Sequence, residues 1–401
     1  MRLPTRALPL IAIAVLAAGC GEVTSTPSSP LSPPAQSAAS AVKFWDVGAS
    51  AAWNERATVM LFSLPSTRPV NAARVYAYLS LAQFRAAEAA EAIQPHPPTS
   101  AAIGAASAQV LRSFLPEFVT QIDAALRAQS VAEPWPGAKH EDFAVGAAIG
   151  RPIGARVFAY SASDRVFPGA GAANPGLPPI GPGYFLLDGR PIARGHYRAR
   201  AFFLSSDDEF RSPPPPAFGS PAFLAALAEV RLISDTRTQL QTDIANYWNV
   251  NQSPRSNAAI NRRANELLRT YRRNDAEAAR ILFLMNAAAY DAAIGCFDAK
   301  FAYWYIRPNQ ADLGIRTVFP TPPHPAYPSA HSCFSGSMTA VLSAIFPSET
   351  DRLTALAEEA SLSRLYAGIH YRFDMDAGLA LGRAVAAKAV AADLDHVAVM
   401  P

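Results

Sequence analysis

The sequence predicts an all-α protein, and three observations support this fold class. Half of the 401 residues are hydrophobic and 17% are charged, which is the composition of a globular chain with a sizeable core. Apolar residues recur at intervals of three and four positions through most of the chain, which is the period of a helix with one buried face. Runs of alternating β-branched residues, the signal of a sheet, do not occur, and only residues 183–204 leave room for short strands.

The predicted helices are rich in Ala, Leu, Arg and Glu, which favour helical backbone. In chain order they cover residues 44–63, 71–94, 101–128, 139–162, 221–249, 256–272, 275–300, 331–346, 350–370 and an alanine-rich final stretch, 376–395. Proline clusters separate them at 27–34, 168–191, 213–221 and 320–328, because proline cannot continue a helix. The connection 163–220 is long for a compact domain, and we interpret it as a wrapping loop or as part of the access route to a site.

The first twenty residues have the form of an export signal. Two arginines precede a short apolar run, residues 7–18, which is too short to span a bilayer as a helix. The signal ends in the sequence LAAGC, and small residues directly before a cysteine resemble a bacterial lipobox. We therefore expect residues 1–20 to be a lipoprotein signal peptide and Cys20 to carry the lipid. The alternative is a plain cleaved signal with an incidental cysteine.

Gly21 follows the cysteine, rather than the aspartate that retains lipoproteins at an inner membrane. In a cell with two membranes, the expected location is therefore the periplasmic face of the outer membrane. Residues 21–42 are rich in serine and proline and suit a tether between the anchor and the fold. We divide the remaining body, expected to be soluble, into an N-terminal helical region, 43–250, and a C-terminal catalytic bundle, 251–401.

Several function classes find no support in the sequence. The net charge of +3 is small and no nucleic-acid-binding motif accompanies it, so we expect no nucleic-acid partner. The arginine-rich stretch 262–280 also contains acidic residues and is typical of a solvated helix face. Only Cys296 and Cys333 remain in the body, which excludes a disulfide scaffold. Both are expected near the site, as two small buried residues or as a bridged pair.

Three segments of the C-terminal half carry candidate site residues. The first, KFAYWYIRP, holds Lys300 and Arg307, whose spacing of seven would place both cations on one face of a helix ended by Pro308. The second, PSAH, holds Ser329, Ala330 and His331 at the start of a predicted helix. Free backbone N–H groups at a helix N-terminus favour an anion, and a histidine there can transfer a proton.

The third segment, SRLYAGIHYRFD, holds Arg364, His370 and Asp374. A guanidinium group can bind two oxygens of a tetrahedral anion. The ring of His370 can offer one nitrogen to phosphorus or to a metal. Asp374, four positions later, is placed to bind the other ring nitrogen and fix the tautomer.

In this order, the three segments resemble the signature of the superfamily of type 2 phosphatidic acid phosphatases (PAP2) and vanadium haloperoxidases. Because the signature specifies many positions at once, it is far more specific than any single segment. One residue departs from it, since Ala330 stands where the usual motif, PSGH, has glycine. Alanine supplies the same backbone N–H and would be strained only at a positive φ.

The resemblance extends to the soluble bacterial haloperoxidase-like branch of the superfamily. It includes residues 43–92, the FRSPPPP segment at 210–216, and the short segments 236–238 and 245–248, and it covers most of 43–390, more loosely in the N-terminal half. It implies an all-α fold of helical bundles with an anion site in one of them.

The resemblance also implies a role for each site residue. Lys300, Arg307 and Arg364 would neutralise the oxygens of a bound vanadate or phosphate, and Ser329 and the N–H of Ala330 would donate hydrogen bonds to them. His370 would bind the central atom, as the protein ligand of vanadium or as the nucleophile that forms a phosphohistidine. His331 would act as the general acid or base.

Two chemistries remain open at this stage, because vanadate resembles the transition state of phosphoryl transfer. One is a haloperoxidase that oxidises halide with hydrogen peroxide and uses vanadate as its cofactor. The alternative is a PAP2-type phosphatase that needs no cofactor. The long N-terminal half and the sequence HYRFD favour the haloperoxidase. A protein that only captures the anion would require neither histidine and is less favoured.

His324 bears on the choice of halide. By the resemblance, it occupies a position where chloride-oxidising members carry an aromatic residue and bromide-oxidising members often carry histidine. Bromide is therefore the favoured halide, and the alternative for His324 is a solvated histidine in a proline-rich loop. The expected partners are small molecules and, through the lipid alone, a membrane. An oligomer is possible.

Overall fold

The structure is a computed structural model, which describes residues 48–64, 71–94, 97–131, 142–166, 173–249 and 255–394. The predicted signal peptide, Cys20 and the tether lie outside the described residues. The predicted domain boundary at residue 250 also lies outside them, so the division at this point stays a prediction.

The all-α prediction is confirmed. The described helices are α2 (Ala49–Ser63), α3 (Ala72–Glu91), α4 (Thr99–Phe114), α5 (Val119–Val131), α6 (Asp142–Ser161), α7 (Pro221–Thr236), α8 (Gln239–Tyr247), α9 (Arg255–Thr270), α10 (Asp275–Tyr303), α11 (Pro308–Ala311), α12 (Ala330–Ile345), α13 (Thr350–Tyr366) and α14 (Arg372–Leu394). Two short 3₁₀ helices, Pro116–Phe118 and Pro347–Glu349, precede α5 and α13. Over the described residues, extended pairing is limited to one isolated antiparallel bridge between Tyr184 and Tyr305.

Two of the predicted helices are each divided into two helices in the structure, so the prediction that they are continuous was wrong. The predicted helix 101–128 breaks after Phe114, where Pro116 cannot donate the next helical hydrogen bond. The predicted helix 221–249 breaks after Thr236, because Thr238 begins α8 with a capping box. In that box, the side chain of Thr238 accepts from the N–H of Gln241, whose side chain accepts from the N–H of Thr238.

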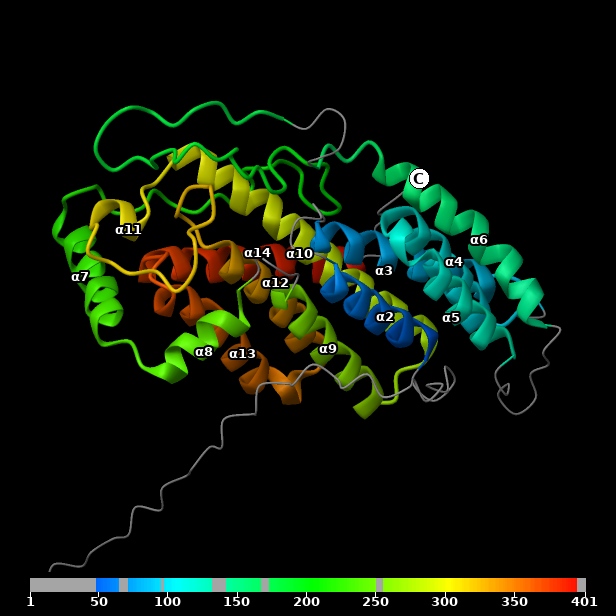
Figure 1. Ribbon diagram of the computed structural model, residues 1–401. Helices are drawn as coiled ribbons and strands as arrows, with labels where there is room; N and C mark the ends of the chain where they lie inside the picture. The colour runs from blue at the N-terminus through cyan, green and yellow to red at the C-terminus, as the bar shows by residue number, and fades with distance from the viewer. Residues whose placement is uncertain are drawn as a thin grey trace, which may run out of the picture. The chain divides into compact units, whose positions relative to one another are not determined.

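Helix α10 lies at the centre of the described structure (Figure 1), between the helices that precede the long connection and those near the C-terminus. It packs against α2, α3 and α4 and also against α12 and α14. It is long and apolar enough to cross a membrane, but the whole of its most apolar stretch is buried inside the protein. This is the ordinary property of a core helix, which is apolar all round because it is covered all round. Its last turn carries Lys300.

Buried asparagines connect α10 to α2 and α9. The amide of Asn261 in α9 bonds both Asn54 in α2 and Asn286 in α10, over distances of 2.9 to 3.1 Å. Asn265 donates to Asn54 over 3.1 Å. Because a buried amide is costly without a partner, this network favours one relative placement of the three helices.

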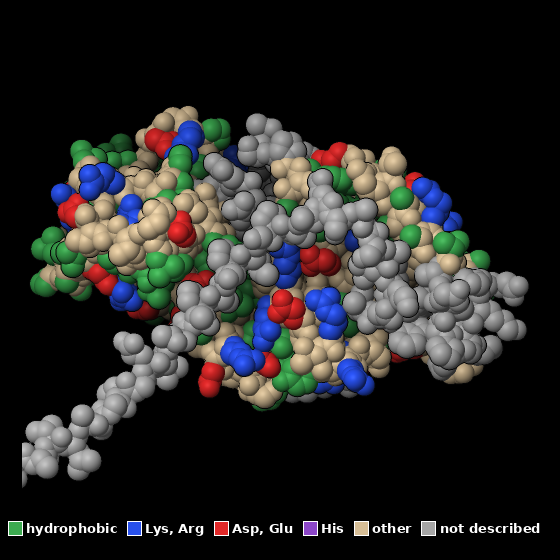
Figure 2. Space-filling view, turned by 60° about the horizontal axis from the view of Figure 1, so that its bottom comes forward, with side chains coloured by type: hydrophobic (Ala, Val, Ile, Leu, Met, Phe, Trp, Pro, Cys, Tyr) green, Lys and Arg blue, Asp and Glu red, His purple; other side chains and the backbone are tan. Residues whose placement is uncertain are grey.

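The surface charges are largely paired. On the face shown in Figure 2, basic and acidic side chains lie interspersed. The arginine-rich stretch 262–280 follows this pattern, since Arg263 pairs with Glu349 and Arg280 with Asp393. Its arginines therefore belong to a solvated, mixed-charge surface, as the sequence predicted.

Candidate active site

Three segments, distant in sequence, meet where α10 ends and where α12 and α14 begin. Ala330 is partly exposed, and the charged and polar site residues predicted from the sequence are all buried: Lys300, Arg307, His324, Ser329, His331, Arg364, His370 and Asp374. Buried charge is unfavourable unless it is paired or holds a ligand. The concentration of such groups at one place therefore marks the site.

The segment from Lys300 to Arg307 differs from its prediction. Helix α10 ends at Tyr303, and Trp304 takes a left-handed conformation, with φ 49°, that closes the helix through its N–H bond to the carbonyl of Lys300. Arg307 is the N-cap of α11, and Pro308 begins that helix instead of ending α10. The two cations therefore do not share a helix face.

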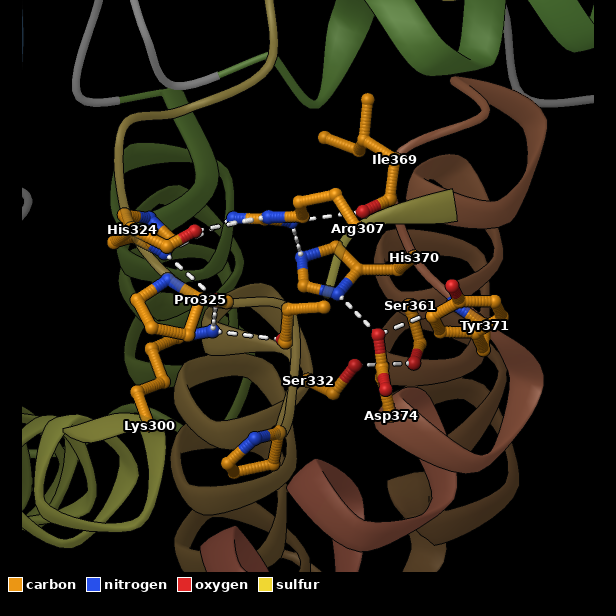
Figure 3. A network of polar contacts seen from close by, with 12 residues as sticks. Lys300, Arg307, His324, Pro325, Ser332, Ser361, Ile369, His370, Tyr371 and Asp374 are labelled. Carbon is orange, nitrogen blue, oxygen red and sulfur yellow. Dashed lines mark hydrogen bonds and ion pairs between the residues drawn. The ribbon is translucent and has the colours of Figure 1, made fainter. Parts of the chain in front are cut away.

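The cations are brought together by backbone carbonyls of the proline-rich segment 324–326. The ammonium of Lys300 donates to the carbonyls of Pro325 and Ala326 over 2.7 and 2.9 Å. Arg307 donates through Nε to the carbonyl of His324 over 3.0 Å (Figure 3). These acceptors have no direct signature in the sequence. The nearby prolines were the one available indication, because proline cannot continue a helix and carbonyls outside a helix remain free to accept other donors.

His370 is fixed at both ring nitrogens (Figure 3). Its Nδ1 lies 2.8 Å from Oδ2 of Asp374, which also accepts from the N–H of Tyr371 over 3.1 Å. Its Nε2 lies 2.9 Å from Nη1 of Arg307. Because a guanidinium group can only donate, Nε2 accepts, and the ring proton is on Nδ1. The lone pair of Nε2 therefore points toward the cation cluster.

Ser329 and Ala330 form the start of α12. Ser329 is its N-cap, but the side chain makes no capping hydrogen bond, and Oγ is buried without a partner among the described residues. Its backbone N–H donates to the carbonyl of Asp374 over 2.8 Å, which holds the turn against α14. Ala330 is the first helical residue and is not among the described non-glycine residues with positive φ. Alanine therefore fits where the usual motif has glycine.

His331 and Arg364 share an acceptor that the sequence analysis missed, the backbone carbonyl of Trp248. Nε2 of His331 lies 2.5 Å from this oxygen, and Nη1 of Arg364 donates to it over 3.4 Å. The Nε atom of Arg364 is buried without a partner among the described residues, and its guanidinium lies over the ring of Phe319, 5.0 Å from the ring centre.

The site has a surplus of positive charge. Among its described residues, three buried cations face one buried carboxylate, Asp374. Burial lowers the pKa of Lys300 to about 8, of Arg364 to about 9 and of Arg307 to about 10. Burial also raises the pKa of Asp374 to about 7, against the opposing effect of Lys300. An anion with two negative charges would balance the surplus.

The histidines of the site are neutral at physiological pH. Burial, and then the nearby cations, hold the pKa of His324, His331 and His370 well below its usual value. A neutral ring leaves one nitrogen able to bind a central atom or to accept a proton.

The site fits a tetrahedral oxyanion. The unpartnered Oγ of Ser329 and Nε of Arg364 are donors, and the buried cations supply the charge. Over the described part of the chain, no cluster of three His, Cys, Asp or Glu side chains could hold a bare metal ion. A metal that enters as an oxyanion needs only one protein ligand, for which Nε2 of His370 is suitably placed.

His324 lies inside the site and not in a solvated loop, so that alternative was wrong. Its side chain is 9% exposed, and its ring packs edge-on against Phe297. Its Nδ1 lies 3.0 Å from Nη2 of Arg307 and 3.1 Å from the carbonyl of Pro325. One tautomer of the ring accepts from Arg307 at this nitrogen and the other donates to Pro325.

The two cysteines lie directly behind the site as free, buried thiols. Cys296 is one turn before Lys300 in α10, and its Sγ lies 3.9 Å from the carbonyl of Pro328. Both belong to a small apolar cluster with Leu381 and Val385.

The long connection also reaches the site. Three tyrosines donate their hydroxyls to carbonyls of its proline-rich part: Tyr303 to Ser212, Tyr327 to Pro213 and Tyr305 to Pro216, over 2.6 to 2.7 Å. The N–H of Phe185 donates to the carbonyl of Trp304 over 2.6 Å. These contacts hold the long connection against the segments that carry Arg307 and Ser329.

Comparisons with known proteins agree with this geometry. Residues 278–395 match the family model described as the PAP2 superfamily, and this range includes all three motif segments. A search of curated proteins gives no match.

Among solved structures, the first bacterial vanadium-dependent iodoperoxidase is similar with a TM-score of 0.69 and 22% identity, over 86% of this chain and 95% of that chain. The apo-type bacterial vanadium-dependent chloroperoxidase is similar with a TM-score of 0.67 and 15% identity, over 85% of this chain and 98% of that chain. The holo-type chloroperoxidase is similar with a TM-score of 0.64 and 16% identity, over 86% of this chain and 96% of that chain. At these identities, the likeness establishes the fold.

Proposed function

Residues 278–395 match the family model of the PAP2 superfamily, and from this premise we propose that the chain is a vanadium-dependent haloperoxidase. It would oxidise halide with hydrogen peroxide at a vanadate held by Nε2 of His370. One observation carries the proposal: a neutral histidine directs a lone pair into a buried cluster of three cations. The likeness of the whole fold to structures of bacterial vanadium haloperoxidases supports it.

The chain's own residues would hold and polarise the oxyanion. Lys300, Arg307 and Arg364 would neutralise its oxygens, and Ser329 and the N–H of Ala330 would donate hydrogen bonds to them. Bound vanadate would supply a Lewis-acidic centre that activates hydrogen peroxide toward halide. Arg307 would release Nε2 of His370 and turn its donor toward the anion.

His331 would move the proton. Its Nε2 carries the ring hydrogen, because that nitrogen faces a carbonyl. Its Nδ1 has no hydrogen bond among the described residues and keeps a lone pair. Since burial holds the pKa of His331 well below its usual value, the ring is neutral at physiological pH and acts first as the base.

We propose bromide as the preferred halide, with His324 as the residue that favours it. The ring of His324 is fixed beside Arg307 and Phe297, at the edge of the cation cluster. A polar ring at this place would favour a larger, more easily oxidised halide over chloride.

A phosphatase is the second candidate, and the PAP2 match favours it. Nε2 of His370 would attack phosphorus as the bond to the ester oxygen breaks. His331, protonated beside the bound dianion, would give that oxygen its proton, and it would then take a proton from the water that releases phosphate from the phosphohistidine. The same cations would stabilise the charge on the phosphoryl oxygens.

The experiment assays one purified preparation for two reactions. The first is oxidation of bromide, iodide and chloride with hydrogen peroxide, with and without orthovanadate. The second is vanadate-free hydrolysis of an aryl phosphate. The variants are His370→Ala and, as a matched control, Arg372→Gln. Arg372 lies two residues further on at the surface, where it pairs with Glu229.

We expect vanadate-dependent bromide oxidation, at least a hundredfold lower in His370→Ala and within about twofold of wild type in Arg372→Gln. Hydrolysis that depends on His370 and is inhibited by vanadate, without halide oxidation, would instead establish the phosphatase. A faster reaction with iodide or chloride than with bromide would overturn the halide proposal alone.

We also propose that the protein is exported and anchored by a lipid on Cys20, on the periplasmic face of an outer membrane. The apolar run, the small residues before Cys20 and the following Gly21 support this proposal.

A further inference from the structure

The backbone carbonyl of Trp248 is an acceptor that two site residues, His331 and Arg364, share. Nε2 of His331 lies 2.5 Å from it, and Nη1 of Arg364 lies 3.4 Å from it. No other hydrogen bond of either side chain occurs among the described residues. One peptide oxygen is therefore the hydrogen-bond acceptor of both groups within the described part of the chain.

This oxygen is available because of its place in α8. Trp248 is the C-cap of the helix, and its N–H bonds back to the carbonyls of Ile244 and Asn246. The last four carbonyls of a helix have no partner within the helix, so that of Trp248 is free to accept. The partial negative charge at this end of α8 also faces the cations of the site, which is the favourable orientation.

The indole ring holds this peptide in place. It is fully buried in the core cluster that α8 shares with α10, α12 and α13. Its Nε1 donates to Oε1 of Glu359 in α13 over 2.9 Å. That carboxylate is at the surface, so a chain of two contacts connects an exposed residue of α13 to the ring of His331.

We propose that Trp248 is a positioning residue for His331, and that Glu359 fixes Trp248 by accepting the hydrogen bond of its indole. The carbonyl of Trp248 holds the ring of His331 in the tautomer with its hydrogen on Nε2, which leaves the Nδ1 lone pair for the substrate. The inference rests on the proposed function in one respect: His331 is the group that transfers the proton.

The charges around His331 make this contact decisive. Arg364 from α13, Lys300 from α10 and Arg307 from the segment before α11 all oppose a positive charge on the ring. The carbonyl of Trp248 favours the charged ring, since this hydrogen bond raises the pKa of His331 whereas burial and the cations lower it. If the peptide moves, the ring loses its one acceptor, and either nitrogen can then carry the hydrogen.

The experiment compares three substitutions in the purified protein. Glu359→Leu removes the acceptor of the indole, whereas Glu359→Gln keeps an amide oxygen in its place. Glu358→Leu is the matched control, because Glu358 is the exposed neighbour and has no hydrogen bond among the described residues. In a second route, Trp248→Phe removes the indole donor and keeps an aromatic ring.

Two quantities are measured. The first is the tautomer of His331 without vanadate, from the ¹⁵N shifts of its ring nitrogens, assigned by their loss in His331→Gln. The second is the pH profile of kcat for whichever reaction the wild type catalyses. We expect Glu359→Leu and Trp248→Phe to mix the two tautomers, to lower kcat about three- to tenfold with little change in KM, and to shift the His331 limb to lower pH. Glu359→Gln and Glu358→Leu should match the wild type.

The inference would be overturned if His331 kept the wild-type tautomer, and kcat kept the wild-type pH profile, in both Glu359→Leu and Trp248→Phe. A wild-type ring with its hydrogen on Nδ1 would also overturn it. The tautomer is read without turnover, so a wild type that oxidises no halide would defeat the proposed function and leave this test intact.

Discussion

The charge of Lys300 depends on what occupies the site. Its ammonium is fully buried and bonded only to carbonyls, among the described residues, and burial lowers its pKa to about 8. A bound oxyanion adds a negative charge beside it and raises this pKa again. Binding of the anion and protonation of Lys300 are therefore linked.

The sign of this linkage gives a prediction. Above pH 8 the free site must take up a proton to bind an anion, so the affinity for phosphate should fall as the pH rises, by up to about tenfold per pH unit. Phosphate suits the test because its own charge hardly changes between pH 8 and 10. Titration calorimetry in buffers of different ionisation enthalpy would measure both the affinity and the proton taken up.

Lys300→Met is the comparison for this measurement. It should bind phosphate more weakly at every pH and lose the steep decline between pH 8 and 9. A wild-type affinity that stays constant between pH 7 and 10 would show that Lys300 keeps its charge throughout and would contradict the prediction.

At the scale of elements, the close approach of α12 and α14 places the motif segments side by side. Gly378 and Gly382 of α14 face the first turns of α12. A Cβ atom on Gly378 would lie 2.6 Å from the carbonyl oxygen of Ser329 and 2.7 Å from Cβ of Ser332. Because Gly378 has no side chain, the two helices lie close enough for the backbone carbonyl of Asp374, one turn earlier, to accept a hydrogen bond from the N–H of Ser329.

Gly378→Ala should therefore destabilise the protein by about 1–3 kcal/mol, because the added methyl group overpacks the contact between two helix backbones. Anion affinity should fall as well, since the start of α12 has to move. Urea unfolding would measure the first effect and phosphate titration the second.

Gly295→Ala in α10 is the matched control. Its added Cβ would lie 3.6 Å from the nearest atom, a methyl carbon of Leu381, which is ordinary contact. Because alanine favours helix over glycine by about 1 kcal/mol, this variant should be as stable as the wild type or more stable. Equal stability losses in the two variants would show that the contact between α12 and α14 is not specially tight.

The sequence predicted most of these elements because their apolar residues keep one period over long stretches, as in α3 and α14. It placed the end of α10 wrongly because the left-handed residue that ends the helix is Trp304, whereas a glycine at this position is the usual sequence signal of a helix end. It also named side chains that the structure brings together, since their types and spacing are specific. The carbonyl of Trp248 could not be predicted in this way, because every residue carries a carbonyl and only the fold decides which one is free.

At the scale of the whole molecule, the proposed reaction is compatible with the proposed location outside the cytoplasm. Its substrates, hydrogen peroxide and halide, are small and would reach an exported enzyme by diffusion. The proposed lipid on Cys20 would keep the enzyme at the membrane, while residues 21–42 would act as the tether.

Replacing Cys20 by serine should shift the protein from the membrane fraction to the soluble fraction, because the thiol that would carry the lipid is lost. Cell fractionation with metabolic labelling by a fatty-acid analogue would measure this. Halide oxidation by the released protein should equal that of the anchored form. Incorporation of label into the serine variant, or a wild type without label, would contradict lipidation at Cys20.

The tyrosines that fix the long connection have one more consequence. Tyr305 and Tyr327 lie two residues before Arg307 and Ser329, and burial raises the pKa of both phenols. Each hydroxyl also donates to a proline carbonyl, which keeps its hydrogen in place. An electrophilic halogen attacks the electron-rich phenolate far faster than the neutral phenol. A catalyst that releases an oxidised halogen beside these rings would therefore be protected from halogenation by its own product.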